Sequence, residues 1–170
     1  MQIRILNRHD DRSSFSCGEI EIDYFFQKYA GQNQFKHYIG TTYVATNERE
    51  IFGFVTVSSG SLSRDELPTH LQKRVPNYPL PILHIVRVGV DKRYQKRGIG
   101  KELIFSAFKL ALEQQKSVGC VGAVVDAKKS AIAFYRRLGF VELEVVRGLS
   151  KARPLPVPMF LPIQTIKKAL

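Results

Sequence analysis

The sequence predicts an α/β fold in which a sheet of mixed strand direction carries helices on both faces, and two observations lead to it. Short apolar, β-branched runs alternate with longer segments whose apolar residues recur at helical spacing. In chain order the expected elements run β-α-β-β-loop-β-α-β-α-β-β, an order in which helices must cover a sheet. With 170 residues, 44% of them apolar, and no break in composition, the chain predicts a single domain over residues 1–170.

The N-terminal part predicts a short strand at residues 3–6, a helix and a hairpin. Ser16 with Glu19 has the form of a capping box, and the helix that follows should end near Gly31. Residues 41–46 and 51–59 are β-rich runs joined by a polar turn, which is typical of a hairpin. The apolar residues expected on the buried face of the helix are Ile22, Phe25, Phe26 and Tyr29.

A long connection, residues 60–81, contains four prolines and one expected helical turn within residues 67–75. Its length is typical of a lid or binding loop, and a disordered excursion is the alternative. Beyond it we expect a buried strand at 81–90, a helix from Gly98, a strand at 118–125, a helix at 128–138 closed by Gly139, a strand at 140–146, a proline-rich segment at 147–158 and a strand at 159–163. The expected buried face of the central helix is Leu103, Ile104, Ala107, Phe108, Ala111 and Leu112.

The junction between the central strand and the central helix reads QKRGIG and has the chemistry of a phosphate site. Helix N-termini present unpaired backbone N–H groups, and glycines let a ligand come close to them. The alternative is a basic, solvated turn. The sequence lacks the G-x-G-x-x-G of dinucleotide folds and the GK[ST] of a P-loop. Basic residues around the junction are Arg93, Lys96, Arg97 and Lys101.

Composition adds a bias toward polyanionic partners. The net charge of +11 and the pI near 9.8 favour binding to nucleic acid, RNA in particular, although many basic proteins bind none. Cys17 and Cys120 have no metal-type spacing, and two cysteines are too few for a disulfide framework. No apolar run reaches the length of a membrane span, and the N-terminus lacks a signal-peptide core, so we expect a cytoplasmic protein.

Gln95, Gly98 and Gly100 form Q-x-x-G-x-G directly after Val88-Gly89-Val90, and this pattern resembles the acetyl-CoA signature of the GNAT acetyltransferases. The element order resembles the GNAT fold over nearly the whole chain, which implies a mostly antiparallel mixed sheet. Gly89 stands where alanine is common in one subgroup of the family, a change expected merely to remove a methyl. The resemblance assigns acetyl-CoA binding to Val88, Gly89, Val90, Gln95, Lys96, Arg97, Gly98, Ile99, Gly100 and Lys101.

A second motif, A-x-x-F-Y-x-x-x-G-F at residues 131–140, resembles the family segment whose tyrosine points at the sulfur of CoA. The resemblance makes Tyr135 the general acid that protonates the thiolate, and a packing tyrosine is the alternative. His84 lies on the core strand where several GNAT enzymes carry a base. A structural histidine whose hydrogen bonds are satisfied within the protein is an equally good interpretation. Arg87 is expected to be buried and to meet an anion, a carboxylate or the substrate. The family often has Asn where this chain has Asp126-Ala127.

Segments on both sides of the motif, among them FSCGEIEIDYFFQKYA and MFLPI, are similar to the GNAT toxins of bacterial type II toxin–antitoxin pairs. That resemblance implies acetylation of the α-amine of aminoacyl-tRNA and a ribbon-helix-helix antitoxin as partner. A homodimer is a separate expectation. An α-amine with a pKa near 7.7 is roughly one-sixth neutral at pH 7 and needs little help from a base. The alternatives are an N-acetyltransferase for a small-molecule or protein amine, and a non-catalytic acyl-CoA-binding regulator.

Overall fold

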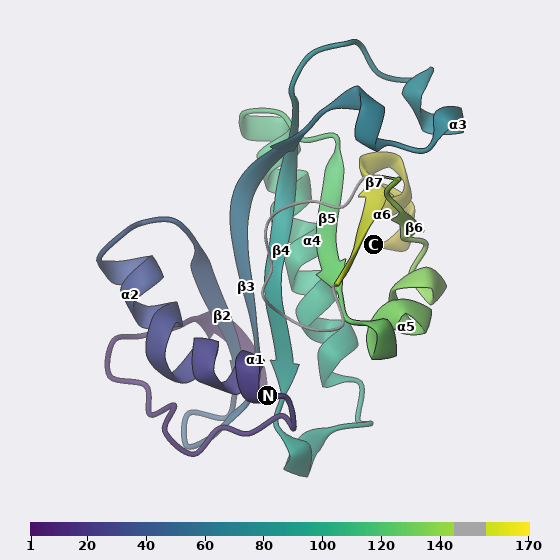
Figure 1. The fold of residues 1–170 in the computed structure, drawn as a ribbon. Coiled ribbons are helices and arrows are strands. Elements are labelled where there is room, and N and C mark those ends of the chain that lie inside the picture. The colour runs from purple at the N-terminus through teal and green to yellow at the C-terminus, as the bar shows by residue number, and fades with distance from the viewer. Residues whose placement is uncertain (145–155) are drawn as a thin grey trace. The chain divides into compact units, whose positions relative to one another are not determined.

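A computed structural model describes residues 1–144 and 156–170, and it confirms the predicted fold class. Within these residues, seven strands form one mixed sheet in the order β1-β2-β3-β4-β5-β7-β6 (Figure 1). The elements are β1 (Gln2–Ile5), α1 (Ile20–Tyr24), the π-helical turn η1 (Phe25–Tyr29), α2 (Ala30–Phe35), β2 (Thr41–Thr46), β3 (Ile51–Leu62), η2 (Arg64–Glu66), α3 (Thr69–Gln72), β4 (Leu80–Val90), η3 (Lys92–Tyr94), α4 (Ile99–Ser117), β5 (Gly122–Ala127), η4 (Lys129–Ala131), α5 (Ile132–Arg137), β6 (Val141–Glu142), β7 (Val157–Pro162) and α6 (Ile163–Ala169).

The chain forms two compact units, each with its own contacts. Unit 1 contains residues 1–58 and 85–107, and unit 2 contains residues 59–84 and 108–170. Strands β3 and β4 and helix α4 contribute one part to each unit. The expectation of a single domain over residues 1–170 stays a prediction.

In unit 1, helices cover both faces of the sheet, and two neighbouring residues of β3 demonstrate it. The ring of Phe54 stacks on that of Phe26 from η1, with centroids 4.2 Å apart. A Cβ placed at Gly53 would instead meet Leu103 and Ile99 of α4. Because consecutive strand residues point to opposite faces, η1 and α4 lie on opposite sides. Strands β1, β2 and β3 pair antiparallel, with Gln2 opposite Thr46 and Thr41 opposite Val57.

The N-terminal helix differs from its predicted form in three ways. The capping box is wrong: α1 begins after Glu19 without a side-chain cap, and the Cys17 amide donates to Asp23. The helix continues past Gly31 to Phe35. A π-helical turn interrupts it, so the residue that follows Phe26 on the buried face is Ala30, while Tyr29 is exposed.

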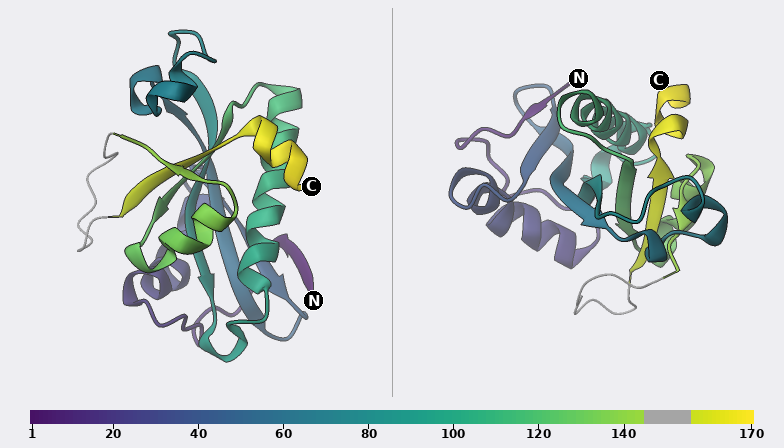
Figure 2. Two further views of the ribbon diagram at one scale, coloured as in Figure 1. Left: turned by 90° about the vertical axis from the view of Figure 1, so that its right-hand side faces the viewer. Right: turned by 90° about the horizontal axis from the view of Figure 1, so that it is seen from above.

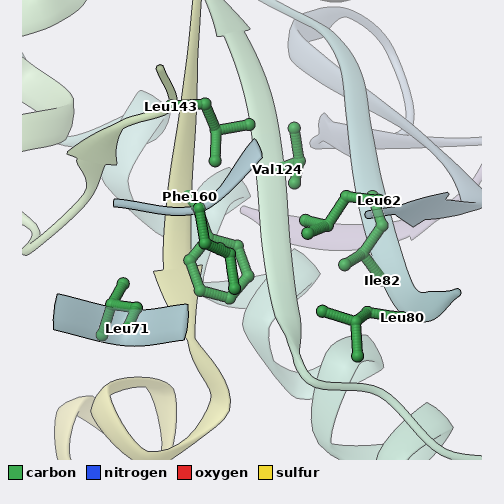
Figure 3. Close-up of a cluster of buried hydrophobic side chains, with 8 residues drawn as sticks. Leu62, Leu71, Leu80, Ile82, Val124, Leu143 and Phe160 are labelled. Atoms are coloured by element: carbon green, nitrogen blue, oxygen red, sulfur yellow. The ribbon is translucent and has the colours of Figure 1, made fainter. Parts of the chain in front are cut away.

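Unit 2 contains a cluster of buried side chains that orders the long connection after β3 (Figure 3). Leu67 and Leu71 from this connection are buried, so these described residues are not a disordered excursion. The cluster consists of Leu62, Leu67, Leu71, Leu80, Ile82, Val124, Leu143 and Phe160. Strand β7 pairs antiparallel with β5 and with β6, and Gly122 lies opposite Pro162.

Helix α4 matches the prediction closely, whereas the strand and the helix that follow it are shorter than expected. Five residues of its predicted apolar face are buried, and Leu112 is half-buried. Strand β5 begins at Gly122 instead of residue 118, because Gly119 turns the chain with φ +105° and Val118 is exposed. The helix expected at residues 128–138 begins as the 3₁₀ turn η4 and is α-helical only from Ile132.

The C-terminal region contains an element that the sequence did not predict. Strand β6 covers two residues of the strand expected at 140–146, and most of the proline-rich segment lies outside the described residues. Helix α6 continues directly from β7 at Ile163, a position assigned to the strand, and packs against β5 and β7 (Figure 2). Within the described residues, no helix combines the length and apolar character that crossing a membrane requires.

Candidate active site

Asp91, the first residue after β4, fixes the start of the predicted phosphate loop. Its buried carboxylate accepts hydrogen bonds from the backbone amides of Arg93, at 3.0 Å, and Ser16, at 3.3 Å. The Arg93 side chain also donates to it at 3.0 Å. Burial by itself would raise the pKa of Asp91, but the hydrogen bonds from Arg93 and Ser16 outweigh burial and lower the pKa. The loop therefore begins at an ionised aspartate whose carboxylate is held by hydrogen bonds from Arg93 and Ser16.

We expect Asp91→Asn to reduce the free energy of unfolding by about 1–3 kcal/mol at pH 7, because the loop loses hydrogen bonds to a buried charge. The pKa is lower in the folded state, so this stabilisation is present above the ordinary pKa of aspartate and is lost as the pH falls through the folded-state pKa. The difference in free energy of unfolding between wild type and variant, measured by urea unfolding, should therefore be largest at pH 7 and should shrink as the pH is lowered below the ordinary pKa of aspartate. Asp65→Asn, at an exposed carboxylate of η2, is the control. Equal stability of wild type and Asp91→Asn at pH 7 would contradict the assigned role.

Gln95 of the Q-x-x-G-x-G pattern joins the loop to its surroundings. Its side-chain amide donates to the carbonyl of Val90, at 2.9 Å, and to that of Cys17, at 2.8 Å. It thus connects the loop with the end of β4 and with the segment before α1. The structure thus gives Gln95 a positioning role, and its predicted contact with acetyl-CoA stays a prediction.

The two glycines of the pattern serve different purposes. Gly98 has φ +83°, a conformation that side chains with a Cβ rarely adopt. Gly100 lies in the first turn of α4, and a Cβ there would meet only Val90 Cγ2, at 3.7 Å. Within the protein Gly100 therefore has room for a methyl group, and the space over it is open to a ligand. The first amides of α4 have no intrahelical partner and suit a phosphate.

The basic residues of the loop divide into two groups. Arg93 is held by ion pairs to Asp91 and Glu50, both at 3.0 Å. Lys96, Arg97 and Lys101 are exposed. The guanidinium of Arg97 lies 5.6 Å from the ring centroid of Tyr94, and the ammonium of Lys101 lies 5.3 Å from that of Phe105. These three cations are available to an incoming anion, whereas Arg93 stabilises the loop.

At the end of β4 the structure differs from two sequence-based predictions, those for Gly89 and Arg87. A Cβ at Gly89 would come within 2.9 Å of Ile22 and Phe54, so this glycine does more than omit a methyl: the aromatic packing of unit 1 requires it. Arg87 is exposed and not buried, and its guanidinium lies 5.3 Å from the ring centroid of Phe25 of η1. Val88 and Val90 flank Gly89 and are half-buried. A substrate role for Arg87 stays a prediction.

In unit 2, Tyr135 lies in the middle of α5 and is 6% exposed. The ring meets those of Phe134 and Phe140 edge-on, with centroids 5.2 and 5.3 Å away. Burial raises the pKa of Tyr135 well above its ordinary value. The phenol therefore stays protonated at neutral pH, where it can donate a proton but cannot act as a base.

His84, on β4, also belongs to unit 2, and the structure gives it a partner that sequence reasoning missed. Its Nε2 lies 3.2 Å from Oδ2 of Asp126 on β5. Alternation along β5 places Asp126 on the face of Val124, which lies in the same buried cluster as Ile82 of β4. The two-residue spacing that puts His84 on the face of Ile82, and Asp126 on the face of Val124, can be read from the sequence. The register that brings the two strands together cannot.

Residues 39–142 match the family model of the acetyltransferase (GNAT) domain, which is more than half of the chain. The chain therefore belongs to the GNAT acetyltransferase family and is an N-acetyltransferase that uses acetyl-CoA. Among its relatives, the tRNA-acetylating toxin of Mycobacterium tuberculosis is 30% identical over 81% of this chain and 82% of that protein. The probable toxin TacT of Sinorhizobium fredii is 28% identical over 96% of this chain and 91% of that protein.

Solved structures of similar proteins include two of the toxin AtaT. AtaT complexed with acetyl-methionyl-tRNAfMet superposes with a TM-score of 0.82 at 25% identity, covering 99% of this chain and 98% of that one. AtaTR bound with acetyl-CoA superposes with a TM-score of 0.79 at 26% identity, covering 99% and 96%. The likeness thus extends over nearly the whole chain.

Proposed function

We propose that this protein is a toxin that acetylates the α-amine of aminoacyl-tRNA and thereby blocks translation. The observation that carries the proposal is the similarity, over four-fifths of the chain, to a tRNA-acetylating toxin. The match of nearly the whole chain to a toxin in complex with acetylated methionyl-tRNA supports it. Tyr135 would protonate the departing thiolate of CoA, and the loop of residues 95–101 would hold the pyrophosphate.

The distribution of charge favours a polyanionic acceptor. The residues of unit 2 include 14 lysines and arginines against 6 aspartates and glutamates, which gives +8 of the net charge of +11. Tyr135 belongs to this unit, and the exposed Arg136 and Arg137 follow it in α5. Phosphates of a tRNA held near these residues would release counterions, so binding should weaken steeply with salt.

The proposed partners follow from the same assignment. A toxin of this kind requires an antitoxin, and we propose a ribbon-helix-helix protein on the basis of the sequence resemblance. Action on aminoacyl-tRNA implies a cytoplasmic protein. A homodimer is a further element of the proposal, and sedimentation of the purified protein would test it.

The function is tested by adding the purified protein and acetyl-CoA to a cell-free translation reaction. We expect arrest, together with N-acetylated aminoacyl-adenosine that mass spectrometry detects after nuclease digestion of the tRNA. Affinity for charged tRNA should fall by roughly 40- to 150-fold between 50 and 200 mM salt if three or four phosphates are neutralised. Free amino acids, which lack the polyanion, should be poor acceptors. Continued translation with unmodified tRNA, alongside efficient acetylation of small amines or peptides, would overturn the proposal.

A further inference from the structure

His84 and Asp126 form a pair that is accessible from outside the core. The distance between Nε2 and Oδ2 is 3.2 Å, and the two side chains keep 30% and 26% of their surface exposed. Hydrophobic cores rarely contain such a pair, and a fully solvated surface pair would hold its members more loosely. Partial burial on two neighbouring strands instead holds the imidazole in place while leaving part of it open to a ligand.

A glycine on β3, Gly60, lies close to the part of β4 that carries His84. A Cβ at Gly60 of β3 would meet Ile82 at 3.1 Å and the Cβ of His84 at 3.6 Å, so the glycine lets β3 run close beside this part of β4. Nine residues after Asp126 comes Tyr135, on the helix that follows β5. The histidine, the carboxylate and the tyrosine therefore all belong to unit 2.

We propose that Asp126 is a positioning residue that holds His84 as the proton acceptor for the attacking amine, an inference that rests on the proposed acetyl transfer. In the proposed arrangement the Nε2–H group of His84 donates to the carboxylate of Asp126. The neutral imidazole then carries its lone pair on Nδ1. That tautomer makes His84 a base with a fixed orientation, as a third group does in other nucleophile–base arrangements.

The proton balance is complete with His84, Tyr135 and solvent water. The amine nitrogen forms a bond to the carbonyl carbon of the thioester and gives one proton to Nδ1 of His84. The bond between that carbon and sulfur breaks, and the sulfur takes one proton from Tyr135. His84 then releases its proton to water, and Tyr135 takes one back. The products are the N-acetylated amine and free CoA, so no further reactant is needed.

The test compares single-turnover acetylation by His84→Gln, Asp126→Asn and the double variant. Enough of an α-amine is neutral at pH 7 without a base, but its nitrogen must still lose a proton as the bond to the carbonyl carbon forms. A general base for that proton contributes roughly 100-fold or more, so we expect His84→Gln to lower the rate by about that factor and Asp126→Asn by about tenfold or more. Because Asp126 acts through His84, the double variant should be no slower than His84→Gln. Asp126→Glu should recover part of the rate. Affinity for acetyl-CoA should not change in any of them.

Asp10→Asn supplies a matched control, because it removes a carboxylate that is paired with Arg4 in unit 1 at 2.8 Å. We expect this variant to react at the wild-type rate. If Asp126→Asn slows the His84→Gln enzyme as much as it slows the wild type, Asp126 does not act through His84 and the proposal fails. Wild-type rates in His84→Gln and Asp126→Asn would reduce the pair to a structural contact.

A spectroscopic measurement keeps the proposal testable if the variants do not fold. Proton–nitrogen NMR spectra of the wild-type protein should report His84 with its hydrogen on Nε2, and the opposite tautomer would overturn the proposal. The rates can be measured with any amine that the wild type acetylates. A failure to acetylate aminoacyl-tRNA would therefore count against the proposed function and leave the test of Asp126 intact.

Discussion

Gly100→Asp is expected to abolish binding of acetyl-CoA while leaving the protein folded. The added carboxylate would face the proposed pyrophosphate site at the first turn of α4, so it would both fill the space over the glycine and repel the ligand. Inside the protein the substitution meets little resistance, because a Cβ at Gly100 touches only Val90 at an ordinary distance of 3.7 Å. We expect affinity to fall by at least about 100-fold, which corresponds to about 2.7 kcal/mol.

Gly100→Ala is the matched variant that separates ligand binding from folding. Alanine favours helix over glycine by about 0.5–1 kcal/mol, so the ligand-free protein should unfold at a higher temperature. The same methyl group should weaken acetyl-CoA binding if the pyrophosphate lies over this residue. Calorimetric titration and thermal unfolding measure the two effects on one preparation. Wild-type affinity in both Gly100 variants would show that the phosphates bind elsewhere.

Local patterns in the sequence predicted the elements that hold the phosphate loop. Helix α4 followed from apolar residues at helical spacing, and Gly98 with Gly100 marked its start. These signals lie within a few residues of one another, so no long-range information was needed. Gln95 is different, because its side chain donates to the carbonyl of Cys17, 78 residues away in the sequence. Only the folded structure shows that Gln95 connects the loop with the segment before α1.

Long-range pairing explains most of what the sequence did not predict. The contact between His84 and Asp126 depends on how β4 lies against β5, and the period of a strand fixes the face of a residue but not its register. Gly89 is another case, because the ring that excludes a methyl there is Phe54 from β3. The π-helical turn η1 also escaped prediction, since an ordinary helical period placed Tyr29 on the buried face.

Tyr135→Phe is expected to lower the rate of acetyl transfer by about ten- to a hundredfold or more, because it removes the proposed donor to the departing thiolate. The ring remains, and with it the edge-on contacts to Phe134 and Phe140, so folding should hardly change. Burial raises the pKa of the phenol, so Tyr135 stays protonated at and somewhat above neutral pH. The rate of acetyl transfer should therefore not fall in that range through deprotonation of Tyr135. Affinity for acetyl-CoA should stay close to the wild-type value.

The control for this substitution is Tyr43→Phe, because Tyr43 of β2 is a half-buried tyrosine whose pKa burial also raises. Removing its hydroxyl should leave the rate unchanged, which separates a catalytic hydroxyl from one that merely lies in the protein interior. Single-turnover reactions at saturating acetyl-CoA isolate the transfer step from product release. An unaltered rate in Tyr135→Phe would reduce this tyrosine to packing. A fall in rate that only a loss of acetyl-CoA affinity explains would instead assign its hydroxyl to cofactor binding.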